Sequence, residues 1–213
     1  MIITLAHQKG GVGKSTLAVN LAQVLGADIL DLDLQRSCLF WNRTRKEAGA
    51  HELTCYTPNT VDEAKDVMNG YKGADRLLIV DCGGFDSQMN RVALIRSHAI
   101  ITPVSPSQIE LFGLQNFTKI LKEASEKLGR EIVANVVINN ADSRSKASIE
   151  EVQEYIRGAH KYLNLLETVV HWRSDFKKSY AVGLGVTELN PKGKASEEMM
   201  TLTNEVKKML DIK

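Results

Sequence analysis

The chain has 213 residues, a length that suits one α/β domain with a substantial core. With a formal net charge of +1, the chain as a whole is not basic enough to indicate a polyanionic partner. Any nucleic-acid-binding surface must therefore be a local basic patch. Three cysteines without C-x-x-C spacing argue against a disulfide framework or a structural zinc site. Because no apolar run approaches a membrane span and no signal-peptide pattern opens the chain, we expect a cytoplasmic protein.

The first elements surround a glycine-rich turn. Residues 1–6 form an apolar run rich in β-branched residues, which predicts a buried strand, and residues 17–25 carry apolar side chains at helical spacing. A strand, a glycine-rich turn and a helix that opens with Gly-Lys-Ser are typical of a phosphate-binding loop. Lys14 should reach the β- and γ-phosphates, and the Ser15 hydroxyl should ligate Mg²⁺. The predicted nucleotide-binding residues of the loop are Gly10, Gly11, Val12, Gly13, Lys14, Ser15 and Thr16.

The loop departs from the general G-x-x-x-x-G-K-[ST] pattern, because Gln8 stands where the first glycine is expected and a second lysine, Lys9, follows it. This K-G-G-x-G-K-[ST] form resembles the deviant Walker A loop of the ParA/MinD family of ATPases. In that family the first lysine reaches across a dimer interface to the partner's nucleotide. The resemblance therefore implies catalytic roles for Lys9 and Lys14, with ATP and Mg²⁺ as cofactors.

A second predicted strand, residues 27–33, ends in carboxylates. Asp31 and Asp33 occupy alternate positions, so they point to the same face of the strand at the end where parallel sheets place ligands. The run Asp-Leu-Asp-Leu-Gln-Arg-Ser resembles the family motif D-x-D-P-Q-x-S, with Leu34 in place of proline. The resemblance implies that Asp33 positions the attacking water and that it belongs to the metal site together with Ser15 and Asp81. For Asp31 a capping carboxylate and a direct role both stay open.

The third predicted strand, residues 76–81, is strongly apolar and ends in Asp81, the arrangement of a Walker B motif that holds Mg²⁺ with Ser15. The following turn, residues 82–84, resembles the switch II segment of the family. Cys82 within it is either a reactive thiol near the phosphates or a small buried residue, and the second reading is favoured.

Two later strands supply further candidates. Residues 99–107 run into a proline loop that resembles the P-V-x-P-S-x-x-D segment of the family, with Glu110 in place of Asp, which implies that Pro103 and Ser105 lie near the nucleotide. Residues 132–139 form another buried strand ending in Asn139. The resemblance implies an adenine contact for Asn139, and a simple turn is the alternative.

The last part of the chain carries a small basic excess. Residues 142–146 resemble the D-x-R-T loop of the family, and residues 171–178 resemble its I-x-x-R-x-x-F-x-x-A/S segment. Either a sequence-independent DNA surface or a solvated basic face fits this composition. The candidate DNA contacts are Arg173, Lys177, Lys178, Lys192 and Lys194.

The order of elements is βαβα throughout, and the apolar runs lack alternation. This pattern predicts an α/β fold with a doubly wound, mostly parallel sheet and helices on both faces. Further helices are predicted over residues 38–47, 60–68, roughly 109–128, through residue 156 and from about residue 196, with a short strand over residues 51–56. We expect residues 1–213 to form a single domain without an N-terminal helix-turn-helix domain.

The resemblance implies an ATP-driven switch in DNA partition. Two subunits would sandwich two ATP molecules, the dimer would bind DNA non-specifically at the nucleoid, and a ParB-like partner bound to a centromere would stimulate hydrolysis. A related ATPase that positions another cargo, or a non-catalytic nucleotide-dependent DNA-binding module, remains an alternative. A MinD-like membrane-associated regulator is disfavoured because no amphipathic segment follows the last predicted helix. An iron–sulfur carrier of the nitrogenase iron-protein type is disfavoured because no cysteine follows position 82.

Overall fold

A computed structural model describes residues 1–84, 86–142, 144, 146–159 and 161–212. The strands are β1 (Ile2–Leu5), β2 (Asp28–Asp31), β3 (Cys55–Tyr56), β4 (Leu78–Asp81), β5 (Ala99–Val104), β6 (Ala134–Ala141) and β7 (Leu163–His171). The helices are α1 (Lys14–Leu25), α2 (Ser37–Glu47), α3 (Val61–Asn69), α4 (Gln88–Arg96), α5 (Gln108–Leu128), α6 (Lys146–Gly158), α7 (Ser174–Ala181), α8 (Val186–Leu189) and α9 (Lys194–Met209).

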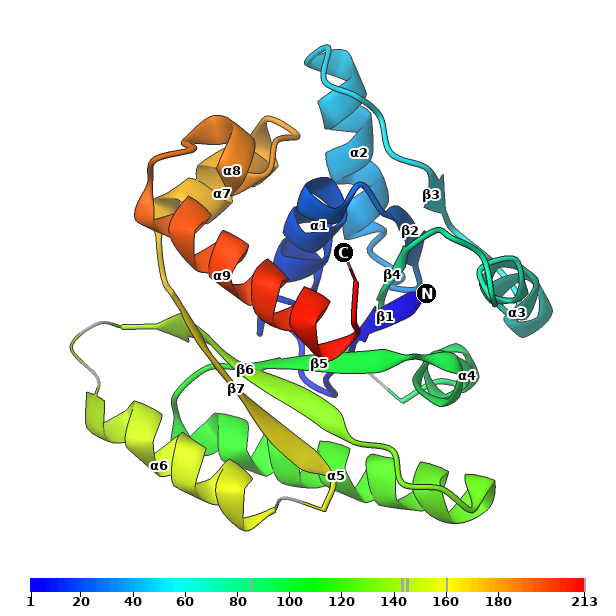
Figure 1. Ribbon diagram of the computed structural model, residues 1–213, viewed down its shortest axis with the longest axis vertical. Helices are drawn as coiled ribbons and strands as arrows, with labels where there is room; N and C mark the ends of the chain where they lie inside the picture. Colours follow the sequence, from blue (N-terminus) through cyan, green and yellow to red (C-terminus); the bar gives the residue numbers. More distant parts are fainter. Residues whose placement is uncertain (85, 143, 145, 160, 213) are drawn as a thin grey trace.

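The strands form one parallel sheet in the order β3-β2-β4-β1-β5-β6-β7, with helices on both of its faces (Figure 1). Side chains alternate across it, so Ile2 of β1 joins an apolar cluster with α3 to α6, whereas Ile3 and Leu5 join a second cluster with α1, α2 and α9. Because both faces are buried, the central strands are continuous apolar runs in the sequence. The predicted doubly wound α/β fold is confirmed.

The strand register brings the motif residues to one edge of the sheet. Leu5 at the end of β1 lies opposite Asp81 at the end of β4, and Asp31 at the end of β2 lies opposite Asp81 as well. The turn that follows β1 therefore begins beside Asp81 of the neighbouring strand β4, with Asp31 of β2 one strand further along the sheet. This is the carboxyl edge, where open parallel sheets bind their ligands.

The predicted helices and the predicted strands are all present. Helix α3 is capped by the Thr60 side chain, which accepts a hydrogen bond from the Glu63 amide, and α5 ends at Gly129 with a φ of 64°. The strand expected over residues 51–56 is shorter, covering only β3. The sequence patterns did not predict β7, α7 or α8. Strand β7 lies at the edge of the sheet and carries polar residues among its apolar ones, so its sequence shows neither a continuous apolar run nor a regular alternation.

Candidate nucleotide-binding site

The turn between β1 and α1 has the backbone of a phosphate cradle. Gly11 and Gly13 adopt φ values of 78° and 97°, a left-handed conformation that side-chain-bearing residues rarely tolerate. Gly13 is the N-cap of α1, and no side chain caps that helix, so its first amide groups are left for an anion. The Lys14 side chain is buried and its Nζ donates to the Lys9 carbonyl oxygen at 2.9 Å, which folds the loop around the ammonium group.

Asn139 at the end of β6 supports this loop from the side. Its Nδ2 donates to the Val12 carbonyl oxygen at 2.7 Å, and its side chain is buried. A Cβ at Gly13 would overlap the Asn139 amide, so Gly13 is needed for its lack of a side chain as well as for its φ. Asn139 therefore positions the loop. Its predicted adenine contact stays a prediction.

Asp81 is fully buried, with 0% of its surface exposed. Burial raises its pKa to about 7, while the Ser15 hydroxyl and the Cys38 thiol beside it act in the opposite direction. The Cys38 Sγ donates to Oδ2 of Asp81 at 3.2 Å, whereas Oδ1 has no hydrogen-bond partner among the described residues. An unpartnered buried carboxylate oxygen beside a serine hydroxyl is the donor set that Mg²⁺ accepts, directly or through water, so these residues fit the metal.

Asp31 and Asp33 have different environments. Asp31 is buried, and its two oxygens accept the backbone amides of Asp33 and Leu39, each at 3.1 Å. The second bond caps the first turn of α2, so the capping interpretation explains Asp31. Asp33 is partly exposed beyond the end of β2, and its Oδ1 accepts the Gln35 amide at 2.9 Å.

The turn after Asp33 lacks the proline of the family motif, and Arg36 takes over its function. Arg36 adopts a left-handed φ of 52°, and its guanidinium donates to the carbonyl oxygens of Asp31 and Pro58 at 2.5 and 2.9 Å. The side chain of Leu34, which stands in the proline position, is 75% exposed. The turn is thus held from its end by arginine hydrogen bonds to the backbone.

Lys9 is tethered within its own chain. Its Nζ forms an ion pair with Glu110 in the first turn of α5, and its amide donates to Nδ1 of His7 at 3.0 Å. The Lys9 side chain is 40% exposed, whereas the Glu110 side chain is only 10% exposed. The ion pair therefore lies at the surface end of the loop. The carbonyl oxygen of the same Lys9 accepts the hydrogen bond from the buried Lys14 ammonium group.

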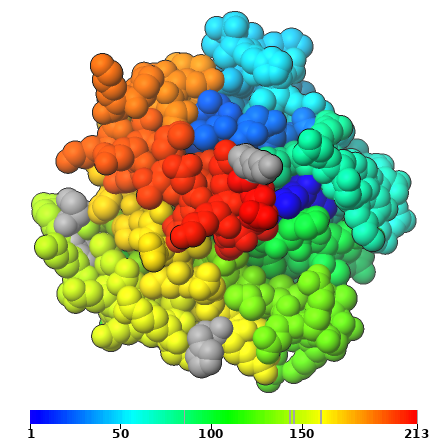
Figure 2. Space-filling model, viewed as in Figure 1, coloured from blue at the N-terminus to red at the C-terminus, as the bar shows by residue number. Residues whose placement is uncertain are grey.

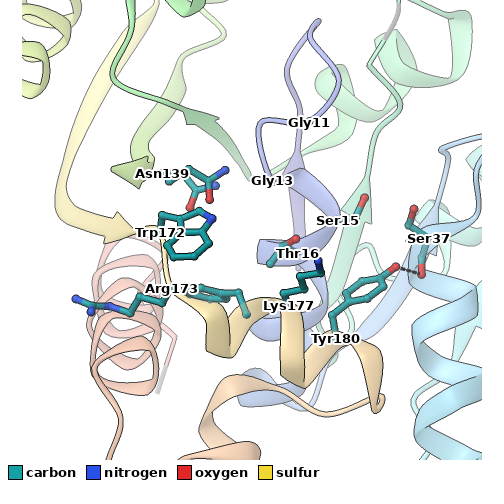
Figure 3. Close-up of a pocket in the computed structure, with 12 residues that line it drawn as sticks. Gly11, Gly13, Ser15, Thr16, Ser37, Asn139, Trp172, Arg173, Lys177 and Tyr180 are labelled. Atoms are coloured by element: carbon teal, nitrogen blue, oxygen red, sulfur yellow. Dashed lines mark hydrogen bonds between the residues drawn. The ribbon is translucent and has the colours of Figure 1, made fainter. Parts of the chain in front are cut away.

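A cavity of about 450 Å³ opens beside the loop, a size usual for small-molecule sites. One wall consists of loop and strand residues, and the opposite wall comes from the end of β7 and from α7 (Figure 3). Its lining residues are Gly11, Gly13, Ser15, Thr16, Ser37, Asn139, Asn140, Trp172, Arg173, Phe176, Lys177 and Tyr180. The cavity thus joins the phosphate cradle to a mixed aromatic and basic wall.

Comparison with known proteins identifies the family. A profile of the CobQ/CobB/MinD/ParA nucleotide binding domain matches residues 3–186. The chain belongs to this family. The predicted ParA/MinD relationship is confirmed, and this domain of the family is a nucleotide-binding domain.

Individual relatives are distant. The chain is 26% identical to Protein ParA of Rhizobium radiobacter over 64% of its own length, and it spans 63% of that relative. It is also 26% identical to the maintenance of carboxysome distribution protein A of Gloeobacter kilaueensis, over 73% of this chain and 70% of that one. Among solved structures, the septum site-determining protein MinD of Pyrococcus horikoshii, complexed with Mg-ADP, superposes with a TM-score of 0.75 at 18% identity, covering 99% of this chain and 97% of that one. At such identity the structural likeness shows the fold.

Several predicted ParA/MinD-type positions lie away from the cavity. Pro103 is part of β5 and Ser105 follows it, and neither is among the described residues that line the cavity. Asp142 and Arg144 pair on the surface with Nη2 to Oδ2 at 2.9 Å. Ser143 and Ser145 of the same predicted loop lie outside the described residues. Contacts of Pro103 and Ser105 with the nucleotide therefore remain predictions.

The candidate DNA contacts separate into two groups. Arg173 and Lys177 line the cavity, and Arg173 is committed to Glu198 of α9 through bonds of 3.1 and 2.6 Å. Lys178, Lys192 and Lys194 are exposed outside the cavity lining. Which of these five side chains contacts DNA stays a prediction.

The sequence motifs missed two parts of the site. Phe176 and Tyr180 stand four residues apart on α7 and therefore share one helical face, and together with Trp172, which lies just before that helix, they form the aromatic wall. The contact between the Cys38 thiol and Asp81 was not predictable from a local sequence motif, because the two residues lie 43 positions apart. Cys82 is fully buried, as the favoured reading had it, and burial raises the pKa of its thiol.

Proposed function

We propose that the protein is a Mg²⁺-dependent ATPase that acts as a nucleotide-driven dimer in partition or positioning. The observation that carries this proposal is the grouping of the buried Lys14 ammonium, the Ser15 hydroxyl and the unpartnered Oδ1 of Asp81, next to a cavity that Ser15 lines. A triphosphate would bring negative charge to the positively charged Lys14 and α1 N-terminus. Mg²⁺ would be held by Ser15 and by the carboxylate oxygen of Asp81 that has no hydrogen-bond partner among the described residues.

The chemical step is phosphoryl transfer to water, in which positioning and charge neutralisation supply most of the catalysis. Bound Mg²⁺ would neutralise the phosphate charge and withdraw electron density from the leaving group. Lys14 binds the β- and γ-phosphates from inside the loop. Asp33, partly exposed at the carboxyl end of β2, orients the attacking water.

Lys9 has the additional function of coupling nucleotide to dimerisation. In the single chain its ammonium group is held by Glu110, and its side chain is 40% exposed. Reaching the phosphates of a second subunit requires that this ion pair open. ATP bound in the partner offers a stronger, multiply charged acceptor, so the exchange favours the ATP-bound dimer over the ADP-bound one.

We propose that the ATP dimer binds nucleoid DNA without sequence preference and that its cargo is a DNA centromere. A ParB-like partner bound to that centromere stimulates hydrolysis, which releases the dimer from the nucleoid DNA. The relative named ParA and the exposed Lys178, Lys192 and Lys194 support this assignment. The protein would then be cytoplasmic and associated with the nucleoid. Within the described residues, no helix combines the length and apolar character needed to cross a bilayer.

A second candidate is the positioning of a cargo other than DNA. It is favoured by the likeness to a maintenance of carboxysome distribution protein, which is as high as the likeness to ParA. Both candidates share the ATP-driven dimer and differ in what the partner protein carries. The MinD-like, membrane-associated alternative has only the fold in its support.

The deciding experiment measures binding to non-specific duplex DNA with ADP, with ATP and with a non-hydrolysable ATP analogue. The proposal expects tight binding with ATP and the analogue and weak binding with ADP. Binding that ignores the nucleotide would overturn the switch. No DNA binding by the ATP-bound protein would overturn the assignment of a DNA surface, and no hydrolysis under any condition would leave a nucleotide-dependent binding module.

A further inference from the structure

Trp172 is an unusually exposed aromatic residue for a site of this kind. Its side chain is 69% exposed, although an indole normally packs against the protein. It lies directly after β7, and its ring points into the cavity beside Asn139 (Figure 3). A large apolar surface left open in the wall of this cavity calls for a ligand with a flat apolar face.

The backbone that carries Trp172 is held from several directions. The Trp172 amide donates to the Ala141 carbonyl oxygen at 3.0 Å, which ties it to the end of β6. On one side Glu198 of α9 accepts the His171 amide at 3.1 Å, and on the other it accepts Nη2 of Arg173 at 2.6 Å. These hydrogen bonds fix the backbone at the end of β7, so the attachment point of the indole is fixed before a ligand binds.

The shape of the cavity fixes which part of a nucleotide meets this ring. The phosphates belong at the glycine loop, because Gly13 opens α1 there and Lys14 is buried beneath it. The base must then lie toward the other end of the same cavity. That end is formed by Trp172 and Phe176. Flat heteroaromatic bases stack favourably on indole faces.

We propose that Trp172 is the stacking surface for the purine base of the bound nucleotide. This inference rests on the proposed function, since it assumes that a nucleoside triphosphate occupies the loop. Stacking recognises the flat face of the base, and the larger purine ring system gains more from it than a pyrimidine does. Trp172 thus determines base affinity, while Lys14 and Ser15 determine phosphate affinity.

The test compares Mg-ATP with inorganic tripolyphosphate, which has the phosphates without the base. Trp172→Ala should weaken ATP binding by about tenfold or more, as expected for the loss of one stacked base, and Trp172→Phe should retain most of it. Neither substitution should change tripolyphosphate affinity. Phe40→Ala is the matched control, because Phe40 is 57% exposed on α2 and outside the cavity lining, and it should bind both ligands normally.

Tryptophan fluorescence gives a second readout that does not depend on activity. The chain has two tryptophans, and Trp41 is buried in the core. ATP should quench the emission of Trp172, tripolyphosphate should not, and Trp172→Phe should abolish the ATP response. CTP and UTP should quench less than ATP.

The possible failures are distinguishable. Wild-type protein that binds neither ATP nor tripolyphosphate would overturn the proposed function together with this inference. ATP affinity that is unchanged in Trp172→Ala would overturn the inference alone. Equal loss of ATP and tripolyphosphate binding in that variant would also overturn it, because the ring would then support the loop and not the base. A thermal melt of each variant confirms that it is folded.

Discussion

The two ends of the cavity are built in different ways. The phosphate end combines a loop of residues close together in sequence, including a buried lysine, with the buried carboxylate of β4, and its shape depends on backbone conformation at Gly11 and Gly13. The end at α7 consists of half-buried and exposed aromatic and basic side chains, joined to the first end only by the fold. Substitutions at the buried end should therefore abolish function, and those at the exposed end should adjust affinity.

The largest effect is expected for Lys14→Ala. Removing a buried ammonium group from a polyphosphate site should weaken ATP binding at least about 100-fold. Equilibrium binding of a fluorescent ATP analogue measures it. Lys122→Ala is the control, because Lys122 forms only a surface pair with Glu126 at 3.9 Å. Retained ATP affinity in Lys14→Ala would contradict the assignment of the phosphate loop.

Lys9→Ala should retain nucleotide binding and lose the ATP-dependent dimer. In the single chain the Lys9 ammonium group is paired with Glu110 and does not contact the chain's own phosphates. Removing it should therefore affect dimer formation and leave nucleotide binding by the single chain unchanged. Sedimentation with and without ATP measures the dimer. Glu110→Gln, which frees Lys9, should instead strengthen dimerisation. A Lys9→Ala variant that dimerises and hydrolyses ATP like wild type would remove the predicted role of Lys9.

Asp33→Ala should keep the ATP dimer and lose turnover. Without the carboxylate the water is no longer oriented, and hydrolysis should fall by about 100-fold. Phosphate release in single-turnover conditions measures the step, and Asp62→Ala on the surface of α3 serves as control. If Asp33→Ala hydrolyses ATP at the normal rate, Asp33 does not orient the water.

The buried end was predictable from the sequence for a physical reason. Phosphate binding depends on backbone amides, glycine conformations and residues at strand ends, and these leave local patterns such as the loop at 8–16 and the terminal Asp81. The opposite end was not predictable, because Trp172 and Gly13 line the same cavity only through the packing of β6 against β7. The missed β7 shows the same limit, since an edge strand with mixed polarity has no distinctive period.

The His7 prediction concerns stability at the buried end. Burial, and then the charges of Lys14 and Lys9, lower the pKa of His7 from 6.5 to about 4. The unfolded chain therefore binds a proton that the folded chain excludes in this window, so wild type should lose stability as pH falls from 6.5 toward 4. The loss is at most about 3 kcal/mol. Chemical denaturation of wild type and His7→Gln measures it, and parallel pH profiles of the two proteins would contradict the assignment.

The smallest effect is expected at the exposed end. Lys178 lies on α7 outside the cavity lining, so Lys178→Ala should leave ATP affinity unchanged and weaken DNA binding by the ATP dimer a few-fold. The weakening should be equal for all DNA sequences, and the slope of log affinity against log salt should fall by about 1. Salt titrations with two unrelated duplexes measure both quantities. Lys178 is outside the cavity lining and should contact neither the phosphates nor the base. A change in ATP affinity in Lys178→Ala would therefore mean that the nucleotide site and the exposed face of α7 are energetically coupled.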